Sequence, residues 1–194
     1  MDHFTQFKAQ VQDAPQGAKY YCNYLAYLGY SQHYDDPVPI ARAYAIESLF
    51  TRHKKHIYDN DLVAGSIRGR ITTDPISDAQ LQLADRVVAS YGSNYFLTNA
   101  DHFAPDYKTF LKDGVQGTLD KIDKSLEVHK NDPDFAKKEV FLTAAKITMK
   151  AFSQMIRQYG EAAKANAQEL TDPFNKSNLQ KIANICEKIS LKAP

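Results

Sequence analysis

The chain has 194 residues, 43% of them hydrophobic and 24% charged, and this ordinary globular composition excludes a chain that is disordered throughout. The formal net charge of +1 gives no overall field that would favour a nucleic acid. No apolar run has the length that a bilayer span needs, so we expect neither a nucleic-acid partner nor a membrane partner.

Apolar residues spaced three and four apart dominate the first half of the chain, and this spacing is typical of helices. It predicts helices over about residues 4–12, 17–30, 39–57 and 78–90. The basic run Arg52–His56 suits the end of the third helix, where the helix dipole is negative, and Ser77 is a suitable N-cap for the fourth. The intervening segment Leu62–Ile71 contains two glycines, which predicts irregular extended chain with at most a short strand near residues 62–67.

Helical patterns continue in the second half. A helix is predicted to begin at Pro105-Asp106-Tyr107 and to run to about Lys130, past Gly114 and Gly117. The further predictions are a long helix near 134–169, an N-cap at Thr171 or Asp172, and a last helix over about 173–190. No internal repeat and no linker divides the sequence. We therefore expect one mainly α, multi-helix domain over residues 1–194.

Motifs with a defined chemistry are missing from the sequence. It contains no dinucleotide or P-loop glycine pattern, no cysteine pair with zinc spacing and no Gly-x-Ser-x-Gly elbow. Cys22 and Cys186 fall on apolar helix faces, which favours inert buried thiols. Two cysteines do not make a disulfide framework, and Met1–Val11 lack an apolar signal core, so we expect a cytoplasmic protein.

Two basic groups of side chains have both a functional and a structural interpretation. His53 and His56 are three residues apart and could bind a metal, but the lysines and arginine around them favour a solvated helix end and no metal site. Arg68 and Arg70 lie on a glycine-rich segment, and arginine forks bind carboxylate or phosphate in two-point contacts. The alternative for the arginines is a salt bridge to neighbouring helices.

Asp101 and His102 form the third candidate site. A histidine beside a carboxylate, just before a helix, can orient a polar substrate. The structural alternative is a histidine that caps this helix. The residues by themselves leave both readings open.

The order of three sequence stretches carries a resemblance to a known family. They are Tyr58-Asp59-Asn60-Asp61-Leu62-Val63-Ala64-Gly65, the run from Asp101-His102 through Pro105-Asp106-Tyr107 to Gly114 and Gly117, and Ile182-Ala183-Asn184-Ile185-Cys186-Glu187-Lys188. In this order they resemble the N-terminal region of glycyl radical enzymes, the pyruvate formate-lyase and diol dehydratase superfamily. The resemblance covers about residues 38–194.

The resemblance implies a role for this chain but no catalysis by it alone. Members of the family are several times longer, store a radical on a backbone glycine and pass it to a cysteine. The chain has neither the Arg-Val-x-Gly-Tyr-like loop nor the Cys-x-Glu motif, so we expect no catalytic residue and no cofactor in it. The resemblance implies that His102 reaches the substrate pocket, with Asp101 standing where the family usually has glycine.

The leading hypothesis is therefore the N-terminal helical portion of a glycyl radical lyase or dehydratase, which packs on the catalytic barrel and lines the pocket for a small polar substrate. Its expected partners are the C-terminal barrel of the same enzyme or a second copy of the chain. The alternative hypothesis is a stand-alone helical interaction protein derived from that region.

Overall fold

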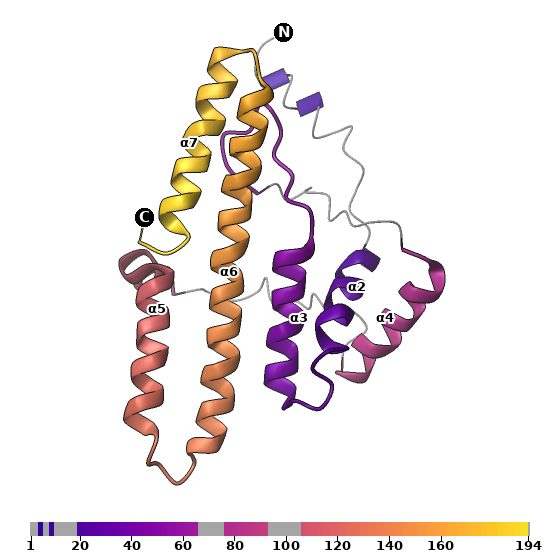
Figure 1. The fold of residues 1–194 in the computed structure, drawn as a ribbon, viewed down its shortest axis with the longest axis vertical. Coiled ribbons are helices and arrows are strands. Elements are labelled where there is room, and N and C mark those ends of the chain that lie inside the picture. The colour runs from indigo at the N-terminus through magenta and orange to yellow at the C-terminus, as the bar shows by residue number, and fades with distance from the viewer. Residues whose placement is uncertain (1–3, 6–7, 10–18, 66–75, 93–105, 194) are drawn as a thin grey trace.

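The computed structural model describes residues 4–5, 8–9, 19–65, 76–92 and 106–193, and its fold is mainly α (Figure 1). Its full helices are α2 (Lys19–Tyr30), α3 (Val38–Arg52), α4 (Asp78–Ser90), α5 (Tyr107–His129), α6 (Phe135–Glu169) and α7 (Pro173–Ile189). No strand occurs in the described ranges, and Leu62–Gly65 bend without pairing. The predicted mainly α class and the long helix near 134–169 are both confirmed.

The helices lie side by side in one layer (Figure 1). Contacts run in the order α4, α2, α3, α6, and the far side of α6 contacts both α5 and α7. At about 1.5 Å per residue, the 35 residues of α6 make a rod of about 52 Å. This length lets α5 and α7 occupy different halves of the same helix. Because the array is one helix thick, the layer has two broad faces that these contacts leave uncovered.

Two separate hydrophobic clusters lie in the layer. The first joins α2, α3 and α4 around Leu25, and the second joins α6 and α7 around Leu179. Both leucines are almost fully buried, and burying each such side chain stabilises the fold by about 1.5–3 kcal/mol. Close helix approach depends on glycine: a Cβ on Gly29 would lie 2.4 Å from the Tyr44 carbonyl oxygen, and one on Gly160 would lie 2.9 Å from the Cys186 Cβ.

Helix ends follow local side-chain chemistry. Ser77 caps α4 in a capping box with Gln80, as its sequence predicts. The prediction that α3 reaches residue 57 is wrong, because the chain turns to an extended conformation at His53. The Lys55 ammonium donates hydrogen bonds to the carbonyl oxygens of Phe50 (2.7 Å) and His53 (2.8 Å), which satisfies acceptors that another helical turn would have paired.

Candidate functional site

The predicted substrate-binding residues, Asp101 and His102, lie outside the described residues, and so do Arg68 and Arg70. The described chain resumes at Asp106, the N-cap of α5. The Asp106 carboxylate accepts a hydrogen bond from the Thr109 backbone N–H at 3.1 Å, and hydrogen bonds from Thr109 lower the pKa of this carboxyl. Asp106 therefore caps α5 and fixes its start at Tyr107, five residues after His102.

Gly114 interrupts α5 about two turns further on. Its φ of 65° and ψ of −168° belong to a region that is essentially restricted to glycine. After this break the Gln116 backbone N–H donates to the Leu191 carbonyl oxygen at 2.8 Å. A Cβ on Gly114 would lie only 2.5 Å from the Ala193 backbone nitrogen. The end of the chain is therefore bound tightly against the interrupted start of α5.

Aromatic side chains fix the start of α5 to the centre of the layer. The Phe110 ring meets the Phe152 ring of α6 edge-on, with centroids 6.0 Å apart, and Phe50 of α3 lies 6.3 Å from the same ring. Such ring pairs add about 0.5–1.5 kcal/mol beyond the area they bury. The Phe152 ring thus joins the start of α5 to α6 and, through its second ring contact, to α3.

The acidic turn of the resemblance, Tyr58–Asp61, is anchored to α7. The Asp61 carboxylate is buried and accepts the Tyr58 backbone N–H at 2.8 Å, and burial raises the pKa of Asp61. The Asn60 side-chain oxygen accepts from the Asn175 amide of α7 at 2.9 Å. The turn therefore has a structural anchoring role, and no cluster of three metal-ligating side chains occurs in the described part of the chain.

The basic end of α3 is partly buried, which the reading as a solvated helix end did not anticipate. Burial lowers the pKa of His53 and lowers that of Lys55 to about 8. The His53 Nδ1 atom lies 2.7 Å from the Leu49 carbonyl oxygen. His53 and Lys55 therefore have a structural role, because both contact carbonyl oxygens at the C-terminal end of α3.

Both cysteines are buried and reduced, as their positions predict. Burial raises the pKa of the Cys22 and Cys186 thiols, so the reactive thiolate is disfavoured at neutral pH. Cys186 packs against Gly160 of α6, where α6 and α7 approach closely. Neither thiol has the accessible, electropositive surroundings of a nucleophile.

A surface pocket of about 500 Å³ lies between α6 and α7. Its floor includes Gly160 and Ala183, and its walls carry the exposed charged side chains Arg157, Glu161 and Lys164. Charges of both signs surround the pocket without a buried polar group aimed into it. The pocket is a groove between two helices rather than a built binding site.

The comparison with protein families decides the identity of the fold. Residues 73–194 match the family described as pyruvate formate lyase-like. The chain belongs to this family. A curated relative, the (2S)-3-sulfopropanediol dehydratase of Klebsiella oxytoca, is 24% identical over 224 residues, covering 85% of this chain and 27% of the relative. The family assignment confirms the resemblance read from the three sequence stretches.

Solved structures of the family have the same arrangement of helices. The glycerol-bound form of the B12-independent glycerol dehydratase from Clostridium butyricum matches all of this chain and 32% of its own, with a TM-score of 0.79 and 22% identity. A glycyl radical enzyme from Archaeoglobus fulgidus gives the same coverage and TM-score at 16% identity. At these identities the match shows the fold. The chain spans about a third of the length of these relatives.

Sequence reasoning missed the contact between Gly114 and the end of the chain. The signal was present, because Gly114 belongs to the stretch that carries the resemblance. However, a glycine in a helical pattern does not say which segment approaches it.

In the described ranges no helix is long and apolar enough to cross a bilayer.

Proposed function

We propose that this chain forms the N-terminal helical part of a glycyl radical lyase or dehydratase, packs on the catalytic barrel, and contributes Asp101 and His102 to the substrate pocket. The observation that carries the proposal is the match of the whole chain, at a TM-score of 0.79, to about a third of a glycerol dehydratase. The parent enzyme would cleave a C–O, C–C or C–N bond of a small polar substrate.

The proposed roles are binding and positioning. A neutral imidazole at His102 can accept a hydrogen bond on one ring nitrogen and donate one from the other, and both suit a substrate hydroxyl. The Asp101 carboxylate can orient that imidazole or bind a second hydroxyl. Once the parent enzyme carries its glycyl radical, that radical would supply the abstraction of a hydrogen atom from the substrate. The cysteine and glycine motifs for that step are not in this sequence.

Two measurements test the proposal. We expect the reading frame or neighbouring gene that follows Pro194 to encode a Cys-x-Glu motif and a radical glycine loop. We also expect the isolated chain, incubated anaerobically with an activating enzyme, to give no glycyl radical signal in electron paramagnetic resonance and no turnover of glycerol or propane-1,2-diol. A genome lacking both motifs beside this sequence, or a radical on this chain, would refute the assignment.

The site residues need a separate test in the assembled enzyme. With whichever probe diol is turned over, His102→Ala should raise KM at least tenfold if the imidazole binds a substrate hydroxyl. His129→Ala is a matched control, because this histidine ends α5, far along the helix from its start, and its Nδ1 atom lies 2.7 Å from the Asp132 carboxylate. Equal KM values for both variants would remove His102 from the pocket.

The alternative of a stand-alone interaction protein receives less support. The relatives reported above are named as dehydratases or as a glycyl radical enzyme, and none is named as a binding protein.

A further inference from the structure

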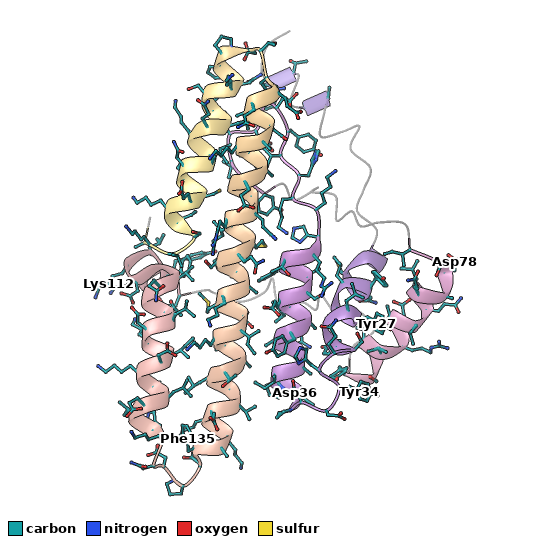
Figure 2. The ribbon with its side chains drawn as sticks, in the orientation of Figure 1. Tyr27, Tyr34, Asp36, Asp78, Lys112 and Phe135 are labelled. Atoms are coloured by element: carbon teal, nitrogen blue, oxygen red, sulfur yellow. The ribbon has the colours of Figure 1, made fainter. Side chains whose placement is uncertain are left out.

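The chain that follows α3 is held against the last two helices by side-chain amides. Asn166 of α6 donates a hydrogen bond to the Ile57 carbonyl oxygen at 2.8 Å, and Asn175 of α7 donates one to the Asn60 side-chain oxygen at 2.9 Å. Figure 2 shows this run of chain leaving the end of α3 and passing beside α6 toward the start of α7. Asn60 is buried, so its bond to Asn175 is shielded from solvent.

Two further amide atoms at this place are buried and lack a partner. The Asn175 Oδ1 atom and the Asn178 Nδ2 atom are shielded from solvent, and neither has a hydrogen-bond partner among the described residues. Asn175 and Asn178 are three residues apart on α7, so their side chains are neighbours on one face of this helix. Because the Asn175 amide bonds Asn60, this is the face that meets the acidic turn.

The two atoms are chemically complementary, since an amide oxygen accepts hydrogen bonds and an amide nitrogen donates them. Leaving such a buried atom without a partner lowers the folding equilibrium constant by about tenfold. Native proteins therefore satisfy most buried polar atoms, either with protein groups or with ordered water. One water molecule can donate to the Asn175 oxygen and accept from the Asn178 nitrogen at the same time, which is the usual role of a buried water.

We propose that Asn175 and Asn178 bind a buried water molecule, which donates a hydrogen bond to the Asn175 Oδ1 atom and accepts one from the Asn178 Nδ2 atom. The water completes the hydrogen bonding of the amide that anchors the acidic turn. With its oxygen bound to water, the Asn175 amide keeps its nitrogen directed at Asn60. The water site is independent of the proposed function, because it needs only residues of α7 and of the turn.

Cross-relaxation between water and amide protons, measured by nuclear magnetic resonance, tests the site in the chain of 194 residues. The buffer contains no small-molecule additive, so water is the only ligand on offer. A long-lived buried water gives laboratory-frame and rotating-frame Overhauser effects of opposite sign at nearby protons, whereas mobile surface water gives effects of the same sign. The rotating-frame experiment also separates cross-relaxation from proton exchange by sign.

We expect the signature of long-lived water at the side-chain amide protons of Asn178. The amide of Asn184, which is exposed on the same helix, should show the signature of mobile water. The signal at Asn178 should persist in Tyr58→Phe, which removes the hydroxyl of the turn that could relay magnetisation from solvent. A mobile-water signature at Asn178, no signal there, or its loss in Tyr58→Phe would overturn the proposal.

Asn178→Leu gives an independent readout, because the presence and the absence of the water predict opposite signs. Without a water, leucine removes an unsatisfied buried donor and raises the folding equilibrium constant. With the water, leucine expels it and leaves the Asn175 oxygen unpaired, so the constant should fall about tenfold.

Asn184→Leu is the matched control for this variant, because it makes the same change at an exposed position of α7 and brings the same gain in helix propensity. Urea unfolding measures both variants. A folding equilibrium constant for Asn178→Leu that equals or exceeds that of Asn184→Leu would refute the buried water.

Discussion

Gly114 and Asp61 show how single residues connect distant parts of this chain. Gly114 permits a break in α5 that the end of the chain fills, and Asp61 closes a turn from which Asn60 reaches α7. Both lie in stretches that carry the family resemblance. Their contacts join the acidic turn to α7 and the end of the chain to the start of α5.

Gly114→Ala should destabilise the chain by about 2–4 kcal/mol, from backbone strain together with overpacking. The added Cβ would lie 2.5 Å from the Ala193 nitrogen and 2.6 Å from the Lys192 carbonyl carbon. Gly92→Ala is the matched control, because Gly92 also has a positive φ (91°) but nothing within 4 Å of its added Cβ. Urea unfolding should show the larger loss for Gly114→Ala, and equal losses would contradict the tight contact.

Asp61→Asn should change how stability depends on pH. Burial raises the pKa of Asp61 in the folded chain above its ordinary value of 3.8, so the folded state holds this proton more tightly than the unfolded state. The resulting stabilisation is present below pH 3.8 and is lost as the pH rises through the folded pKa. The amide of Asn cannot titrate but can still accept the Tyr58 N–H. Relative to Asp61→Asn, the unmodified chain should therefore lose unfolding free energy as the pH rises from 3.8 through the folded pKa, and parallel pH profiles would count against a raised pKa.

At this scale the sequence predicted the fate of the cysteines and the cap of α4, because burial and capping depend on nearby residues. The roles of Asp101 and His102 came from the resemblance and stay predictions. The contacts of Gly114 and Lys55 were not predictable from spacing, because a pattern of apolar positions does not show where a second segment or a folded-back side chain will lie.

The sequence predicted the bounds of α4 and α6 to within one residue, because both helices begin at clear N-terminal signals. α4 has the predicted bounds 78–90, and α6 begins one residue later than expected and ends at residue 169. α3 ends five residues early because Lys55 pairs its last carbonyl groups. The basic run Arg52–His56 suits a helix C-terminus, so the sequence favoured a longer helix than the chain forms.

The start of α7 gives a direct test of helix capping. The sequence left Thr171 and Asp172 as alternatives, and the structure assigns the cap to Asp172, whose carboxylate accepts the Asn175 N–H at 2.8 Å. Asp172→Ala should cost about 1 kcal/mol of unfolding free energy, while Thr171→Ala should change it by less than about 0.5 kcal/mol. Thermal unfolding of both variants measures the difference, and a larger loss for Thr171→Ala would reverse the assignment.

The whole molecule is a single layer with two separate clusters, and the arrangement in space could not be read from the sequence. Helical periodicity shows that each helix has an apolar side but not which neighbour covers it. The order of contacts from α4 through α2 and α3 to α6 came from the structure alone.

Separate clusters imply that the two ends of the layer lose stability independently. Leu25→Ala should cost about 2–5 kcal/mol, and should speed hydrogen exchange in α2, α3 and α4 more than in α6 and α7. Leu179→Ala in the other cluster should have the converse effect. Exchange measured by mass spectrometry separates these outcomes. Uniform acceleration in either variant would show instead that the layer unfolds as one unit.

The hydrogen bond from the Gln116 N–H to the Leu191 carbonyl oxygen also fixes where the end of the chain lies. The last described residues are held against α5. Any polypeptide joined after Pro194 would therefore start from a fixed position on the folded helices. The search that brings a following segment back to α5 is then shorter, and the entropy lost in closing that loop is smaller. The break in α5 would thus fix the starting position of any polypeptide joined after Pro194.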